Sequence, residues 1–149
     1  MQFLIGTHDD IDPWIELVRE VSPVFPGLET EEAIEDHKNT VLRFMGEKRA
    51  LCVKIHGEIA GVLLFSVKHN MICCLAVSPA HRKKGVASAL LAAALERLDR
   101  SRDITVSTYR EGDEKGVAAR PLYKKFGFEE GELIEDFGYP NQVFVLRPK

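Results

Sequence analysis

The stretch that decides the fold reads Leu75-Ala76-Val77-Ser78-Pro79-Ala80-His81-Arg82-Lys83-Lys84-Gly85-Val86-Ala87. An apolar strand pattern ends at Val77, a polar, basic loop follows, and an apolar helical pattern then runs from Val86 to Leu98. The N-terminus of a helix has unpaired N–H groups and about half a positive charge, so it binds phosphate readily. Gly85 has no side chain and lets the backbone come close to a ligand. The segment therefore predicts an anion site, with basic side chains at its rim.

Two common phosphate motifs do not match this segment. It lacks the Gly-Lys-Ser/Thr ending of a P-loop, and it has one of the three glycines of a dinucleotide fingerprint. One alternative stays open, in which the loop is a solvated basic cap on a helix. A nucleic-acid patch is disfavoured, because the loop has no interleaved aromatic residues and the net charge of the chain is −3.

Upstream of this segment, the patterns predict two helices and four strands. Residues 1–7 read as a strand, Asp12-Pro13 opens a helix, and the prolines and glycine of residues 22–27 break it. Thr30 caps a second helix that runs to about Phe44. The strands Ala50–Ile55, Ile59–Val67 and Met71–Val77 then follow as an antiparallel meander, with the first turn at residues 56–58.

Downstream, a strand is expected at Ile104–Thr108, then a charged loop and a last helix at Val117–Phe126, which Pro121 should distort or confine to the segment after it. A closing hairpin of Glu132–Phe137 and Val143–Leu146 turns at residues 138–141. The whole pattern predicts one domain, residues 1–149, of the α/β class. The antiparallel meander at its centre is expected to be covered on both sides by helices.

The bulk properties exclude several classes of protein. A net charge of −3 gives no pull toward nucleic acid or anionic membranes, and no apolar stretch is long enough to cross a bilayer. The N-terminus does not read as a secretion signal, so we expect a cytoplasmic protein. The histidines are scattered, so we expect no metal, and the three cysteines, Cys52, Cys73 and Cys74, read as reduced core residues. A homodimer stays open.

Two motifs give the chain a resemblance to a known family. Residues 82–87 match the Arg/Gln-x-x-Gly-x-Gly/Ala motif of the GNAT (GCN5-related N-acetyltransferase) superfamily, and Val77-x-Pro79 has the spacing that often precedes it. Leu122-Tyr123-Lys124-Lys125-Phe126-Gly127-Phe128 is similar to the family's second signature, a tyrosine near a helix end followed by Gly-Phe. The resemblance implies a mixed, mostly antiparallel splayed sheet with helices on both faces. It also implies that the domain binds acetyl-coenzyme A (acetyl-CoA).

The implied activity is transfer of an acetyl group from acetyl-CoA to a primary amine of a small molecule or peptide, by direct attack in a ternary complex. A different acyl-CoA donor and a non-catalytic acyl-CoA-binding module stay open as alternatives. By the resemblance, the pyrophosphate is held by the backbone of Arg82, Lys83, Lys84, Gly85, Val86 and Ala87. The pantetheine arm pairs with Leu75, Ala76 and Val77. The N–H of Leu75 or Val77 faces the oxyanion.

Tyr123 is the implied acid for the departing thiolate, since a phenol and a thiol have similar pKa values. The position seven residues before it, an asparagine in many members, is Gly116 here. The base of the histone-type members is also missing, because its position is Met71. Glu111 is our candidate base, with Asp113 and Glu114 as alternatives by location.

The acceptor site is expected in two variable segments, which contribute Phe25 from residues 25–27 and Glu135, Asp136 and Tyr139 from the hairpin. Their carboxylates suit a cationic amine. The alternative is that this charge serves solubility alone.

Overall fold

The computed structural model describes residues 1–25 and 27–148, so Pro26, in the expected break between the first two helices, lies outside the described residues. The helices and strands follow the predicted order. They are β1 (Gln2–Ile5), α1 (Ile11–Val21), α2 (Glu31–Gly46), β2 (Ala50–Ile55), β3 (Glu58–Ser66), β4 (Met71–Val77), α3 (Val86–Arg97), β5 (Ile104–Tyr109), α4 (Ala119–Lys125), β6 (Glu129–Asp136) and β7 (Tyr139–Leu146).

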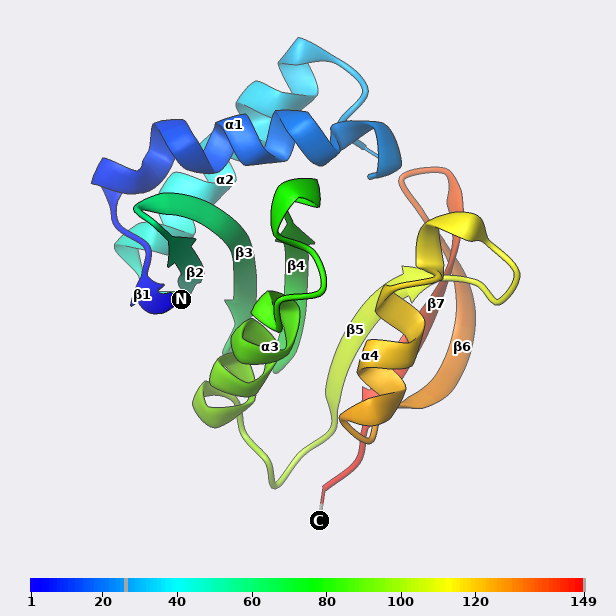
Figure 1. The fold of residues 1–149 in the computed structure, drawn as a ribbon. Coiled ribbons are helices and arrows are strands. Elements are labelled where there is room, and N and C mark those ends of the chain that lie inside the picture. Colours follow the sequence, from blue (N-terminus) through cyan, green and yellow to red (C-terminus); the bar gives the residue numbers. More distant parts are fainter. Residues whose placement is uncertain (26, 149) are drawn as a thin grey trace.

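All strands form one open sheet in the order β1-β2-β3-β4-β5-β7-β6. Every neighbouring pair is antiparallel except β4 and β5, which are parallel. These two strands pair at Met71↔Thr105 and Ile72↔Val106 and then diverge toward their C-terminal ends (Figure 1). The predicted fold class, a mixed and mostly antiparallel splayed sheet, is confirmed.

Helices cover the sheet on both faces, and the apolar strands pack against both layers. On one face, Leu51, Leu63 and Leu90 belong to a core beneath α3 and α4. On the other, Trp14 and Cys52 belong to a core beneath α1 and α2. Successive strand residues alternate between the faces, which is why the central strands are apolar at nearly every position.

α3 approaches the sheet closely at one glycine. A Cβ built on Gly61 would lie 2.5 Å from Val86 Cγ1 and 3.0 Å from Leu90 Cδ1. A larger residue there would push the first turn of α3 away from β3.

Two local predictions differ from the structure. The hairpin turns at Phe137-Gly138, whose φ angles of 53° and 72° are both positive, whereas Tyr139–Asn141 belong to β7. A two-residue turn with two positive φ angles matches the twist of antiparallel strands, which decides the site of the turn. Pro121 neither distorts α4 nor confines it to the residues after the proline: the helix begins at Ala119, two residues later than predicted, and Pro121 is its third residue. The N–H groups of a first turn have no intrahelical partner, so a proline costs little there.

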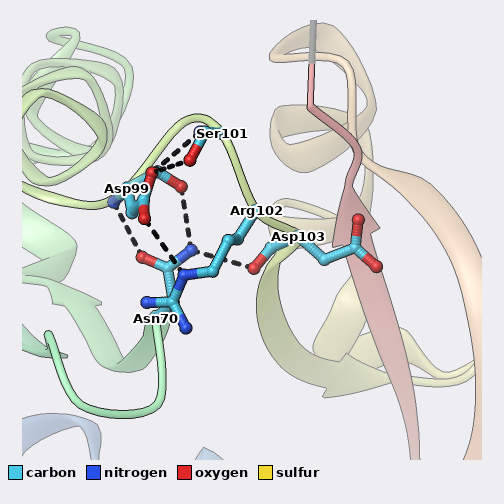
Figure 2. A network of polar contacts seen from close by, with 5 residues as sticks. All are labelled: Asn70, Asp99, Ser101, Arg102 and Asp103. Atoms are coloured by element: carbon cyan, nitrogen blue, oxygen red, sulfur yellow. Dashed lines mark hydrogen bonds and ion pairs between the residues drawn. The ribbon is translucent and has the colours of Figure 1, made fainter.

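A buried asparagine joins the segments at the point where β4 and β5 meet. Asn70 Nδ2 donates to the carbonyl oxygens of Asp99 and Asp103, both at 2.9 Å, and its Oδ1 accepts from the Asp99 N–H at 2.8 Å (Figure 2). The Asn70 carbonyl accepts from Thr105 N at 3.3 Å. One residue of the β3–β4 turn therefore holds the start of β5 against the start of β4.

Candidate active site

The edge of β4 that faces β5 is open beyond Ile72, because among the described residues β5 pairs with β4 at Met71 and Ile72 alone. Ser78 N donates to Ala60 O at 2.8 Å, which makes that pair a hydrogen-bonded one. Hydrogen-bonded and non-bonded pairs alternate along an antiparallel ladder. Leu75 and Val77 therefore direct their N–H and C=O groups away from β3, toward the side that β5 has left. An extended chain can pair with such an edge.

A bulge interrupts β4 just before this edge. Leu64 pairs with Cys74 and Phe65 with Ile72, so Cys73 is the extra residue. Cys73 is exposed, and our prediction that all three cysteines lie in the core is wrong for this one. A bulge residue is left out of the pairing, and strand alternation can no longer place it on a buried face. Burial raises the pKa of the Cys74 thiol to about 12, so this thiol stays protonated at neutral pH.

The loop before α3 exposes backbone donors. Lys83 and Gly85 have φ angles of 62° and 79°, and the first helical bond runs from Ala89 N to Gly85 O at 3.0 Å. The N–H groups of residues 86–88 thus precede the first intrahelical bond. A Cβ built on Gly85 meets no atom within 4 Å, so the positive φ, rather than crowding, favours glycine here. Such an arrangement of unpaired N–H groups can bind an anion.

The basic side chains of the loop have separate positions. Lys84 Nζ lies 3.3 Å from His81 Nδ1, and His81 Nε2 lies 3.8 Å from a carboxylate oxygen of Glu58. Arg82 and Lys83 are exposed. Val86 faces inward and is buried against β3, so only its backbone is available to a ligand.

Tyr123 is buried in α4, with 4% of its surface exposed. Its ring centre lies 5.7 Å from that of Phe128 and 6.1 Å from that of Phe144. Burial raises the pKa of Tyr123 well above its usual value, and the nearby Cys74 thiol raises it further. The hydroxyl therefore keeps its proton at neutral pH and lies within electrostatic reach of β4.

Arg120, which we did not single out from the sequence, fastens α4 to the sheet. The side chain is buried, and its Nη1 donates to Tyr109 O and to Gln142 Oε1, both at 2.8 Å. Its Nη2 lies 3.1 Å from Glu130 Oε1, an ion-pair contact without hydrogen-bond geometry. One signal could have found it: an arginine three residues before Tyr123 lies on a neighbouring part of the same helix face.

Gly116 is tightly enclosed, and this explains the missing asparagine. A Cβ at this position would lie 2.9 Å from Tyr109 Cβ and 3.3 Å from Arg120 Cδ. No asparagine side chain fits without displacing the end of β5 or the arginine.

The two segments that we assigned to the acceptor meet in the structure. A Cβ built on Gly27 would lie 2.9 Å from Phe137 Cγ, so the hairpin tip touches the α1–α2 connection. Phe25 is half-buried against the core beneath α1 and α2. Figure 1 shows the end of α1 reaching toward the β6–β7 turn.

The acceptor-site candidates of the hairpin divide between two faces. Asp136 pairs with Tyr139, so these two side chains share a face, whereas the adjacent Glu135 pairs with Pro140 and faces the other way. Tyr139 donates to Asp113 Oδ2 at 2.7 Å. This hydrogen bond raises the pKa of Tyr139 and lowers that of Asp113.

Glu111 is exposed in the loop after β5. It lines a hollow of about 350 Å³ between that loop and the first turns of α4, together with Gly112, Asp113, Glu114, Gly116, Val117, Arg120, Pro121 and Lys124. Glu111 and Asp113 thus lie in the same loop, which follows β5 on the far side of the β4–β5 divergence.

Within residues 1–25 and 27–148, no helix is both long and apolar enough to cross a membrane. The same residues contain no group of three His, Cys, Asp or Glu side chains that could hold a metal ion.

Comparison with known proteins identifies the domain. Residues 14–128 match the model of the acetyltransferase (GNAT) family. No curated protein matches the sequence. Among solved structures, a GNAT-family acetyltransferase from Bacillus cereus is 22% identical with a TM-score of 0.77, over 99% of this chain and 97% of that one.

Two further solved structures are similar in fold. The ribosomal-protein-S18-alanine N-acetyltransferase from Escherichia coli is 18% identical with a TM-score of 0.74, over 98% of this chain and 92% of that one. The PaiA N-acetyltransferase from Thermoplasma acidophilum, in complex with coenzyme A, is 15% identical with a TM-score of 0.71, over 98% of each chain. At these identities the likeness concerns the fold alone.

Proposed function

Because the chain belongs to the GNAT acetyltransferase family, we propose that it transfers an acetyl group from acetyl-CoA to a primary amine, by direct attack in a ternary complex. The observation that carries the proposal is the open edge of β4. It runs from a bulge near the buried Tyr123 to the donor-rich loop before α3. The acceptor class that we propose is a small molecule or the flexible end of a peptide.

The donor fits this edge at two places. Unpaired N–H groups at residues 86–88, with Arg82 and Lys83 beside them, match the charge and geometry of a pyrophosphate. The outward N–H and C=O groups of Leu75 and Val77 match the amides of a pantetheine arm. We assign the oxyanion contact to one of these two N–H groups.

Tyr123 is the proposed proton donor to the departing thiolate. Its raised pKa keeps the phenol protonated, which a donor requires. The same rise makes complete proton transfer costlier than from an exposed phenol, so a hydrogen bond to the developing thiolate forms the larger part of its role. Direct attack is favoured over an acetyl-cysteine intermediate at Cys74, because burial raises the pKa of that thiol to about 12.

The attacking amine must lose a proton, since at pH 7 roughly one lysine-like amine in a few thousand is neutral. We assign the removal of this proton to Glu111 or to a water molecule beside it. Asp113 is the weaker candidate, because its carboxylate already accepts from Tyr139 and from Lys115 N. The similar structure from Escherichia coli is named for an alanine of ribosomal protein S18, which is consistent with a peptide acceptor.

The experiment combines calorimetry with a thiol-release assay. Acetyl-CoA is titrated into the wild type and into Gly85→Glu, and coenzyme A release is then followed with a panel of primary amines and peptides. We expect binding to the wild type, at least tenfold weaker binding to the variant, and release that depends on the amine. Tight binding without amine-dependent release would contradict the enzymatic proposal. Equal affinity of the two proteins would contradict the binding site.

A further inference from the structure

Tyrosine, aspartate and asparagine side chains gather at the end of β5, across the sheet from the start of β7. Tyr109 ends β5 and Tyr139 begins β7, with their rings edge to face at 5.8 Å. Asp113 lies in the loop that follows β5. Burial raises the pKa of Tyr109 to about 12, and Asp113, Tyr139 and the Cys74 thiol of β4 add to the rise. Tyr109 thus lies at the end of β5, beyond the two residue pairs that join β5 to β4.

This group already holds a cation of the chain itself. The ammonium nitrogen of Lys115 lies 4.6 Å from the centre of the Tyr139 ring. The Tyr139 hydroxyl donates to Asp113, which increases the electron density that the ring presents to a cation. Lys115 also contributes to the lowered pKa of Glu29, after the larger effect of the Gly27 N–H, so a second carboxylate lies near the ammonium.

Asn141 adds a polar atom that lacks a partner. It pairs with Tyr109 across the sheet and follows Tyr139 by two residues, so the three side chains share one face. Asn141 is 8% exposed, and its Oδ1 is buried with no hydrogen-bond partner among the described residues. A buried amide oxygen needs a donor, and the N–H of an amine can supply one.

We propose that Tyr109, Asp113, Tyr139 and Asn141 form the subsite for the cationic head of the acceptor, and that Lys115 occupies it as a tethered competitor. The inference rests on the proposed function and names a residue that sets its acceptor specificity. The carboxylates of Asp113 and Glu29 and the ammonium of Lys115 sum to one negative charge. Removing the lysine charge leaves two negative charges and an uncovered aromatic ring.

An acceptor must therefore displace Lys115 before it binds. A primary ammonium has the charge and the N–H donors that the subsite lacks once the lysine has left. An anionic acceptor head has neither and would meet the carboxylates directly. Removal of the Lys115 charge should strengthen the binding of a cationic acceptor at this subsite. If Lys115 instead held an anionic group of the acceptor, the same change should weaken binding.

The test compares Lys115→Met, which keeps the side-chain length and removes the charge, with Lys115→Arg, which keeps the charge. The probe is n-butylammonium, titrated into the acetyl-CoA-bound protein and followed by the NMR signals of the tyrosine rings. We expect two- to fivefold tighter binding to Lys115→Met, the range for an exposed cation–π contact, and little change for Lys115→Arg. The gain should vanish in Lys115→Met combined with Tyr139→Leu.

Equal or weaker binding to Lys115→Met would overturn the inference, as would a gain that persists without the Tyr139 ring. The binding measurement needs no acetyl transfer, so it tests the Lys115 subsite separately from the proposed enzymatic function. Binding that follows the expected pattern without coenzyme A release would contradict the enzymatic function alone. Transfer to n-butylamine with a KM that ignores Lys115 would contradict the subsite alone.

Discussion

Replacing Asn70 by alanine should destabilise the protein at the junction of β4 and β5. Asn70 is 2% exposed and has a φ of 50°, in the left-handed region. Its side chain makes three hydrogen bonds to the backbone of Asp99 and Asp103. Alanine removes all three bonds and keeps a Cβ in a conformation that disfavours it.

The magnitude follows from these two effects. Three hydrogen bonds at about 1 kcal/mol each amount to about 3 kcal/mol. A left-handed alanine costs roughly 1–2 kcal/mol more, whereas asparagine tolerates that region. We expect Asn70→Ala to lower the free energy of unfolding by about 4–5 kcal/mol. For a domain of this size that corresponds to a fall in Tm of roughly 8–20 °C.

Asn70→Gly is the matched control, because it removes the same bonds but accepts the positive φ. Asn70→Gly should lower the free energy of unfolding by about 1 kcal/mol less than Asn70→Ala does. Both values come from urea denaturation followed by circular dichroism, with equal m-values as the check on two-state behaviour. A loss below about 1 kcal/mol in Asn70→Ala would refute the reasoning, and a glycine variant less stable than the alanine variant would refute the backbone part.

Three other predictions concern the site. Tyr123→Phe should lower kcat by ~10²–10⁴-fold with acetyl-CoA affinity nearly unchanged, since the ring still packs; an unchanged rate in a chemistry-limited assay would remove Tyr123 from the mechanism. Asp136→Asn should raise the KM of a cationic acceptor and high salt should do the same, whereas Glu135→Gln, on the opposite face, should not; equal effects of the two variants would contradict this assignment. Iodoacetamide at pH 8 should modify the exposed Cys73 before the less exposed Cys52 and Cys74, as read by mass spectrometry of digests; faster labelling of Cys74 would contradict the bulge.

The order of elements could be predicted because its signals are local. Periodicity indicates which residues of a segment are buried. Gly85 and its basic neighbours identify the loop before α3. The cap at Thr30 is a further case, since its hydroxyl accepts from Ala33 N at 3.0 Å as a capping residue should. The resemblance to the GNAT superfamily came from two such local motifs.

The candidate site depends on which distant segments of the chain come into contact. The periodicity of a sequence carries no information about such contacts. The edge of β4 is open because β5 leaves it after two residue pairs, and those pairs join positions more than thirty residues apart. The bulge at Cys73 and the opposite faces of Glu135 and Asp136 follow from strand register, which is set by pairing across the sheet.

The polar contacts of the site likewise depend on tertiary structure and not on local sequence. Nothing in the sequence near Lys115 indicates that its ammonium lies over the ring of Tyr139, or that Asp113 accepts from that tyrosine. Arg120 reads as a surface helix residue until β5 and β7 enclose it. Local sequence determined the elements and the glycine-containing basic loop before α3. Tertiary structure alone decided the arrangement of the proposed acceptor side, because burial and charge contacts there arise between chain segments that are distant in sequence.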